Sequence, residues 1–142
     1  MGDEREVERA AHDELLLYTL AHPDPRFPHQ HAVDARALTQ ADGHTKPIAL
    51  AFALLGLCLH LERGFSGRDV QRVHMDLARK RVPLPTFRVP AARSALRVTD
   101  VLAAAPGPER DRALEAWCAS VWAAWASEHA AVRAWLARCG LG

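Results

Sequence analysis

Three histidines and one aspartate, spread over successive predicted helices, are the residues of this sequence best suited to chemistry. His31 and Asp34 lie three residues apart, so they share one face of a helix. His60 and His74 each lie among apolar neighbours, which predicts that both face the core. Helical bundles build metal sites from such groups on different helices, and imidazole with carboxylate suits zinc, iron, nickel or manganese. The sequence therefore predicts a divalent transition-metal site formed by His31, Asp34, His60 and His74.

Two other interpretations of these residues remain open. Without a metal, the His31–Asp34 pair could act as a catalytic general base, because imidazole titrates near neutrality. Alternatively, each histidine is simply hydrogen-bonded in the core, as buried polar groups usually are. There is no His-Glu-x-x-His pair and no two-cysteine zinc pattern. Cys58 lies in apolar surroundings that would raise its pKa and make it unreactive. Enzyme status and cofactor are therefore undecided.

Composition excludes some partners. The 142 residues carry 18 basic and 17 acidic side chains, for a net charge of +1, so no nucleic-acid partner is expected. The one basic stripe, Arg68, Arg72 and Arg79, has acidic neighbours and is expected to be a solvated helix face. The longest apolar run, residues 48–61, is too short to span a bilayer. With an acidic start and no disulfide pattern, we expect a cytoplasmic protein without a membrane partner.

The hydrophobic pattern predicts one all-α domain over residues 1–142, a bundle of about five helices. Apolar residues at helical spacing and the positions of Pro and Gly place helices at 6–22, 28–42, 47–63, 67–81 and 108–138, with a short turn at 99–104. Thr45 is the expected N-cap of the third helix, and Ser66 with Asp69 resembles a capping box at the fourth. Prolines make 82–98 an irregular segment. The helix at 47–63 should be central because it is apolar nearly all round.

The last predicted helix contains all four tryptophans, at 117, 122, 125 and 135. Trp122 and Trp135 cannot both lie at the centre of its apolar stripe, so an exposed aromatic edge is expected, although most of these rings should be core. Exposed aromatic surface is typical of subunit interfaces. The alternative function is therefore a non-catalytic interaction module that forms a homodimer through this helix.

Several segments together resemble an uncharacterised bacterial family of small helical proteins. Residues 29–35 read His-Gln-His-Ala-Val-Asp-Ala, similar to the family signature His-Gln-His-x-Val-Asp-Ala-Tyr. The likeness extends over most of the chain, through residues 45–50, 59–75, 99–104 and 116–122. The resemblance implies a small helical protein but brings no known activity.

The sequence departs from this family pattern at two places. Arg36 stands where the signature has Tyr, and Thr39-Gln40 stands where a Gln-His pair would fall. If those positions line a family pocket, Arg36 and Gln40 would present a guanidinium and an amide to a small anionic or carboxylate-bearing ligand. The other interpretation is that this face of the helix meets solvent.

Overall fold

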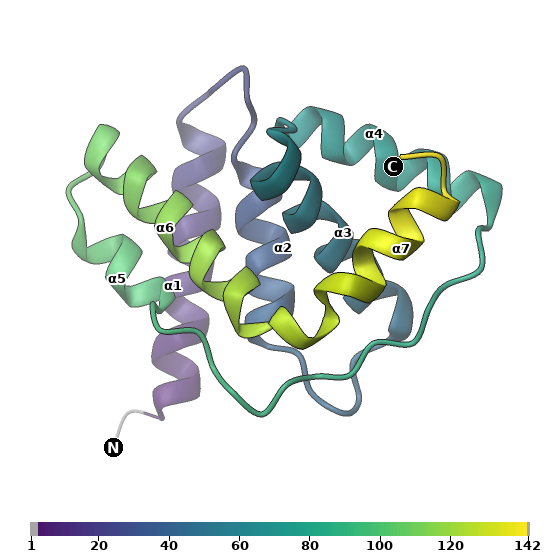
Figure 1. The fold of residues 1–142 in the computed structure, drawn as a ribbon. Coiled ribbons are helices and arrows are strands. Elements are labelled where there is room, and N and C mark those ends of the chain that lie inside the picture. Colours follow the sequence, from purple (N-terminus) through teal and green to yellow (C-terminus); the bar gives the residue numbers. More distant parts are fainter. Residues whose placement is uncertain (1–2, 142) are drawn as a thin grey trace.

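The computed structural model describes residues 3–141, and every regular element within that range is helical (Figure 1). The α-helices follow one another with a single 3-10 turn between the last two. In chain order they are α1 (Glu4–Ala21), α2 (His29–Thr39), α3 (Pro47–Arg63), α4 (Gly67–Lys80), α5 (Val98–Ala103), α6 (Pro108–Ala124), η1 (Ala126–Glu128) and α7 (His129–Arg138). The all-α prediction is confirmed, with more helices than the five expected.

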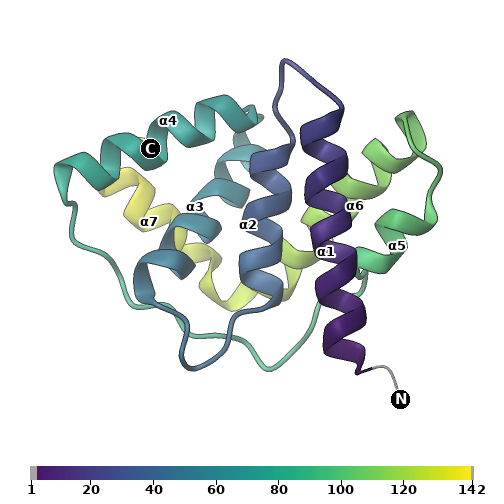
Figure 2. The same ribbon diagram turned by 180° about the vertical axis from the view of Figure 1, so that it is seen from behind.

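Helices α1 and α2 form an antiparallel pair joined by a loop at one end of the molecule (Figure 2). Asp3 caps α1 by accepting a hydrogen bond from Arg5 N at 3.0 Å. Helix α1 ends before Pro23, because the residue that precedes a proline is disfavoured in the helical conformation. Helix α2 packs against α1, α3, α4 and α6, so a side chain on α2 can meet groups from most of the fold.

The boundary between α2 and α3 differs from the prediction. Helix α2 ends at Thr39 rather than near Asp42. Asp42 instead forms a turn with Thr45, whose Oγ1 accepts a hydrogen bond from Asp42 N at 2.9 Å. Thr45 is therefore occupied by this turn, and Lys46 is the N-cap residue of α3, with Pro47 in the first turn. The prediction that Thr45 caps α3 is therefore wrong, because its hydroxyl accepts a hydrogen bond from Asp42 N instead.

Helix α3 lies at the centre of the fold, as predicted. It contacts α2, α4, α6 and α7, and Ala53 and Leu57 are 2% and 0% exposed. The buried apolar side chains of the described residues form one continuous cluster around it. Although α3 is the most apolar helix, none in residues 3–141 is long and apolar enough to cross a membrane.

The junction between α3 and α4 follows the predicted signals. Gly64 ends α3 with φ 70°, a left-handed conformation that glycine adopts without steric cost. Ser66 Oγ then accepts a hydrogen bond from Asp69 N at 3.1 Å, and Asp69 Oδ2 accepts one from Ser66 N at 3.3 Å. This reciprocal capping box fixes the start of α4 and the direction in which the chain leaves α3.

Residues 82–97 contain no helix and run as a long connection from α4 to α5 (Figure 1). The predicted irregular segment is thus confirmed, except that Val98 already belongs to α5. Phe87 is buried along this path, so the segment packs against the helices.

The last predicted helix is broken. Residues 108–138 form α6, η1 and α7, which meet in a V (Figure 1). At the break, His129 stacks on Trp122 with ring centroids 3.8 Å apart, and its Nε2 pairs with Trp122 O at 2.8 Å. The same carbonyl accepts a hydrogen bond from Trp125 N at 3.0 Å, so the imidazole is its second partner at the break. The bend lets Trp122 on one arm and Trp135 on the other both be buried, although their spacing would place them on different faces of a straight helix.

Replacing Ser66 by alanine should lower the free energy of unfolding by about 1 kcal/mol, because the N-cap oxygen of α4 is lost. Urea denaturation measures this change. Ser127→Ala is the matched control, since the Ser127 hydroxyl bonds only the exposed Glu128 side chain and should cost less than about 0.5 kcal/mol. Equal effects of the two substitutions would contradict the assigned cap.

Candidate functional site

The centre of the candidate site is a stack of two imidazole rings, His31 on α2 and His60 on α3. Their ring centroids are 3.5 Å apart and the planes are inclined by 14°. Both side chains are buried, at 2% and 8% exposure. His31 lies in the first turn of α2 and His60 in the last turn of α3, so the stack forms where these two helices cross.

His60 is held through both ring nitrogens. Its Nδ1 pairs with Phe65 O at 3.0 Å, a contact that the left-handed turn at Gly64 makes possible. Its Nε2 pairs with Glu115 on α6. The hydrogen bond from His60 lowers the pKa of Glu115. A carbonyl oxygen and a carboxylate oxygen thus lie at the two ring nitrogens of His60 and fix the orientation of its ring between Phe65 and Glu115.

His31 is the neutral partner in the stack. Burial, and next the positive charge on His60, lower its pKa to about 4. Within the described part of the chain its Nδ1 is buried without a hydrogen-bond partner. The backbone carbonyl of His31 accepts a weak bond from Cys118 Sγ at 3.8 Å, which ties α2 to α6. His31 therefore presents an uncharged imidazole with an unused nitrogen.

Asp34 lies one turn from His31 on the same face of α2 and is 4% exposed. Burial raises the pKa of its carboxyl well above the usual value, although a hydrogen bond from Gln30 opposes this shift. Gln30 Nε2 donates to Oδ1 at 3.0 Å, whereas Oδ2 has no partner among residues 3–141. Burial therefore favours the protonated form of Asp34, and one of its carboxyl oxygens has no partner within residues 3–141.

Gly56 makes room for this carboxyl group. A Cβ placed on Gly56 would lie 2.0 Å from Asp34 Oδ2 and 3.2 Å from Val70 Cγ1. The absent side chain allows α2 and α3 to approach closely enough for His31 and His60 to stack one turn away on each helix. Asp34 is thus the specific neighbour that requires glycine at position 56, one turn before His60.

The fourth predicted ligand, His74, lies elsewhere. Its Nε2 pairs with Phe52 O at 2.8 Å and its ring stacks on Phe52 with centroids 4.9 Å apart. Phe52 is eight residues before His60 on α3, which corresponds to about 12 Å along the helix. The structure thus brings His31, Asp34 and His60 together and leaves His74 as a half-buried group that is hydrogen-bonded to Phe52.

The arrangement of the stacked rings bears on metal binding. An ion bound to an imidazole lies close to the plane of that ring, and two nearly parallel planes 3.5 Å apart meet only far outside the site. His31 and His60 would have to rotate out of their stack to share an ion. Consistently, residues 3–141 contain no group of three or more His, Cys, Asp and Glu side chains placed to hold a metal.

The predicted binding residues Arg36 and Gln40 lie away from the stack. Arg36 donates from Nη1 to Asp13 on α1 at 2.9 Å and from Nε to Gln40 Oε1 at 3.2 Å. Its side chain is 23% exposed. The guanidinium therefore bridges α2 to α1 at the surface, as expected for a residue two positions from Asp34.

Three participants in or near the site escaped the sequence analysis. Glu115 is separated from His60 by 55 residues, and no local pattern marks it as the partner. Gln30 could have been found, because it lies four residues before Asp34 on a helix. His12 on α1 is 1% exposed, and burial, aided by Arg36, lowers its pKa to about 4. The buried His12 Nε2 and Trp117 Nε1 have no partners within residues 3–141.

The tryptophan side chains are all interior. Trp117, Trp122, Trp125 and Trp135 are between 0% and 7% exposed. The expectation of an exposed aromatic edge on the last helix is therefore wrong, because the break at η1 turns both arms toward the core. Core packing, the interpretation favoured for most of these rings, holds for all of them.

The cysteines near the site are poor nucleophiles. Burial raises the pKa of Cys58 to about 11 and that of Cys118 well above its usual value. The prediction that Cys58 is unreactive agrees with this environment.

Gly56→Ala should lower the free energy of unfolding by about 1–3 kcal/mol, since its Cβ would overlap Asp34 Oδ2. Replacing glycine by alanine within a helix normally stabilises a protein, so a destabilising effect here would be unusual. In an Asp34→Ala background the same change should be tolerated. Gly43→Ala, where nothing lies within 4 Å of a new Cβ, is the control. Urea denaturation of the four variants decides the matter, and a more stable Gly56→Ala protein would contradict the close approach.

Asp34→Asn should make the folded protein more stable relative to wild type as pH rises above 3.8. In that range the unfolded wild-type chain releases the Asp34 proton, whereas burial keeps it on the folded chain. The wild-type protein therefore loses stability as pH rises toward the raised pKa, and asparagine removes that loss. Urea denaturation between pH 4 and 8 measures the difference. A difference independent of pH would show that Asp34 ionises normally.

The pKa of His31 is lowered, whereas that of Asp34 is raised, so the two residues affect the pH dependence of stability in opposite directions. Its pKa of about 4 lies below the unfolded value of 6.5, so the wild-type protein loses stability as pH falls through this interval. The full loss amounts to about 3 kcal/mol. His31→Asn should remove this contribution and leave that of His12, which has a similar pKa. An unchanged acid dependence in the variant would contradict a neutral, buried His31.

Comparison with known proteins places the chain in a family. The model of the Family of unknown function (DUF5946) matches residues 9–126, a range that includes His31, Asp34, His60 and Glu115. No curated protein and no solved structure matches the chain. Because the family match spans more than half of the sequence, the resemblance noted in the sequence is confirmed at the level of family, and the chain belongs to this family of unknown function.

Proposed function

We propose that this protein binds a small polar molecule at the buried pair His31 and Asp34 and can exchange a proton with it. One observation carries the proposal. His31 Nδ1 and Asp34 Oδ2 are both buried and unpaired in the described structure, and leaving such an atom unpaired costs about 1–3 kcal/mol. A molecule that bonds to both atoms would recover this cost.

The protonation states define the ligand. Asp34, as a carboxylic acid, offers an O–H donor, and neutral His31 offers either an acceptor or a donor according to its tautomer. The complementary molecule is small and uncharged and carries an acceptor and a donor side by side, as a primary carboxamide does. A charged ligand would lose its hydration without gaining an opposite charge at this depth.

Proton transfer is supported by the same environment. A neutral imidazole and a neutral carboxylic acid on one helix face can act as base and acid without a net charge change in the core. The His60–Glu115 ion pair, with Glu115 half exposed, lies at the outer side of the stack. Burial is the main cause of the lowered pKa of His31; His60 lowers it further, whereas Glu115 raises it.

The metal site predicted from the sequence remains an alternative for the same residues, although the stacked rings and the position of His74 give it less support. The interaction module that would dimerise through the Trp-rich C-terminal segment also has less support, because its tryptophans are buried within the chain.

Acetamide is the probe that tests the proposal, in nitrogen-15 correlation spectra of the labelled protein. We expect it to shift the resonances of residues 30–34 and 56–60, and acetone, which only accepts hydrogen bonds, to shift them less. Asp34→Asn should still bind, since its amide donates, whereas Asp34→Leu has a similar shape without polar atoms and should not. His44→Ala, at an exposed histidine, is the control.

Two results would overturn the proposal. The first is an absence of acetamide shifts at these residues, or shifts that persist in Asp34→Leu. The second is a stoichiometric metal in the purified protein that is lost in both His60→Ala and His74→Ala, which would favour the shared metal site instead.

A further inference from the structure

A concave region lies near the C-terminal ends of α2 and α6, and its lining includes neither His31 nor His60. It is a groove of about 620 Å³ between the N-terminal turns of α1, the C-terminal ends of α2 and α6, and residues 89–97. We call residues 89–97 the strap. The volume lies within the range of about 300–1,000 Å³ typical of small-molecule sites.

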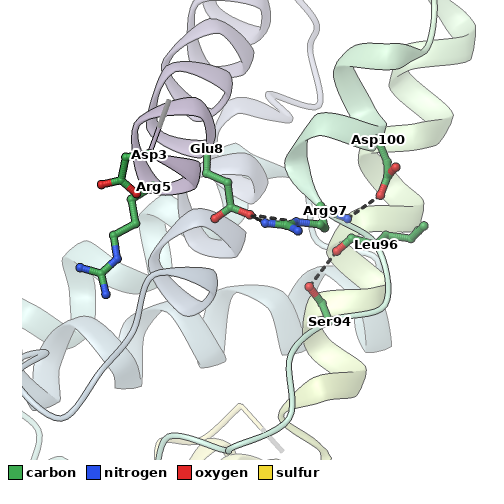
Figure 3. Close-up of polar contacts among 7 residues, drawn as sticks. All are labelled: Asp3, Arg5, Glu8, Ser94, Leu96, Arg97 and Asp100. Atoms are coloured by element: carbon green, nitrogen blue, oxygen red, sulfur yellow. Dashed lines mark hydrogen bonds and ion pairs between the residues drawn. The ribbon is translucent and has the colours of Figure 1, made fainter. Parts of the chain in front are cut away.

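The strap is hydrogen-bonded to helical segments at both ends, whereas in its middle Ser94 Oγ donates to Leu96 O of the strap itself at 2.8 Å. Before it, Arg88 N donates to Glu128 Oε1 at 2.7 Å. At its far end, Leu96 N donates to Ser120 Oγ at 2.9 Å, and Arg97 Nε donates to Glu8 Oε1 at 2.9 Å. Figure 3 shows Arg97 reaching from the strap to Glu8 on α1. Between these anchors the residues 90–95 read Pro-Ala-Ala-Arg-Ser-Ala, and such small side chains leave the space beneath them unfilled.

The exposed lining of the groove is more polar than apolar, but its deepest part is apolar. Four core side chains contribute to this apolar floor, each at most 3% exposed: Leu38, Val98, Val121 and Trp125. They come from α2, α5, α6 and the residue that follows α6. An occupant that covers this floor would need an apolar body.

The rim of the groove carries both acidic and basic side chains, and its arginines outnumber its glutamates. Arg97 and Glu8 neutralise one another. Of the remaining lining residues, Arg5 and Arg93 are basic and Glu4 is acidic, and neither arginine forms an ion pair with another described residue. Figure 3 shows Arg5 pointing away from the Glu8–Arg97 pair. A carboxylate at the rim would therefore find two guanidinium groups without ion-pair partners.

We infer that this groove binds an amphipathic carboxylate, an apolar chain with one anionic end. The chain lies on the floor beneath the strap, and the carboxylate bonds Arg93 on the strap or Arg5 across from it. Bidentate pairing with a carboxylate is a geometry that guanidinium favours. None of these residues belongs to the His31–Asp34 site, so the inference stands independently of the proposed function.

The test uses three probes that share one apolar chain: octanoate, 1-octanol and octylammonium. We expect octanoate to bind about tenfold more tightly than octanol in titration calorimetry, as a charge-assisted hydrogen bond provides, and octylammonium to bind most weakly. Nitrogen-15 spectra should show octanoate shifts at residues 89–97 and 121–125 and none at 31–34.

Variants distinguish the contribution of the arginines to binding from that of the apolar floor. Arg5→Gln with Arg93→Gln should weaken octanoate binding about tenfold and leave octanol binding unchanged. Arg88→Gln, an exposed arginine outside the groove lining, should change neither. Ala124→Phe, which fills the groove, should abolish both. The inference is overturned if octanoate does not bind, if octanol or octylammonium binds equally well, or if the shifted resonances lie outside the groove.

Discussion

The close approach of α2 to α3 at Gly56 is the constraint on which the rest of the structure depends. With no side chain at this position, the Asp34 carboxyl group rests directly against the α3 backbone. The same approach brings His31 onto His60 one turn further along. Both helices are nearly enclosed by the others, so the contact is made in the most water-poor part of the molecule. A polar pair placed there cannot be hydrated, and its protonation states follow from that fact.

Burial and one ion pair together determine the electrostatics of the site. The hydrogen bond with His60 lowers the pKa of Glu115, and burial, followed by the electrostatic effect of His60, lowers the pKa of the neighbouring His31. Asp34 meets no cation at hydrogen-bonding distance in the described structure, and burial raises the pKa of its carboxyl well above the usual value. The cluster therefore combines one charged pair near the surface with two neutral groups behind it. A buried imidazole and a buried carboxyl group can each gain or lose a proton, which suits proton exchange with an uncharged molecule.

The His31–Asp34 site and the groove beneath the strap are formed by opposite ends of α2. Its first turns carry Gln30, His31 and Asp34, whereas Leu38 and Thr39 near its end line the groove beneath the strap. Helix α6 likewise provides Glu115 to the first region and Val121 to the second. The two sites are thus built on the same rigid helices and are chemically distinct, one neutral and buried, the other charged at its rim and open.

The sequence by itself determined the helical class, the central position of residues 47–63, the capping box at Ser66 and the irregular segment before α5. Each depends on local periodicity, proline or capping chemistry, which act over a few residues. It also placed His31, Asp34 and His60 on inward faces. Only the tertiary structure decided that Glu115, 55 residues away, pairs with His60, that His74 bonds Phe52 instead, and that the last helix bends at His129. These outcomes depend on which faces meet in three dimensions, and spacing along one helix does not contain that information.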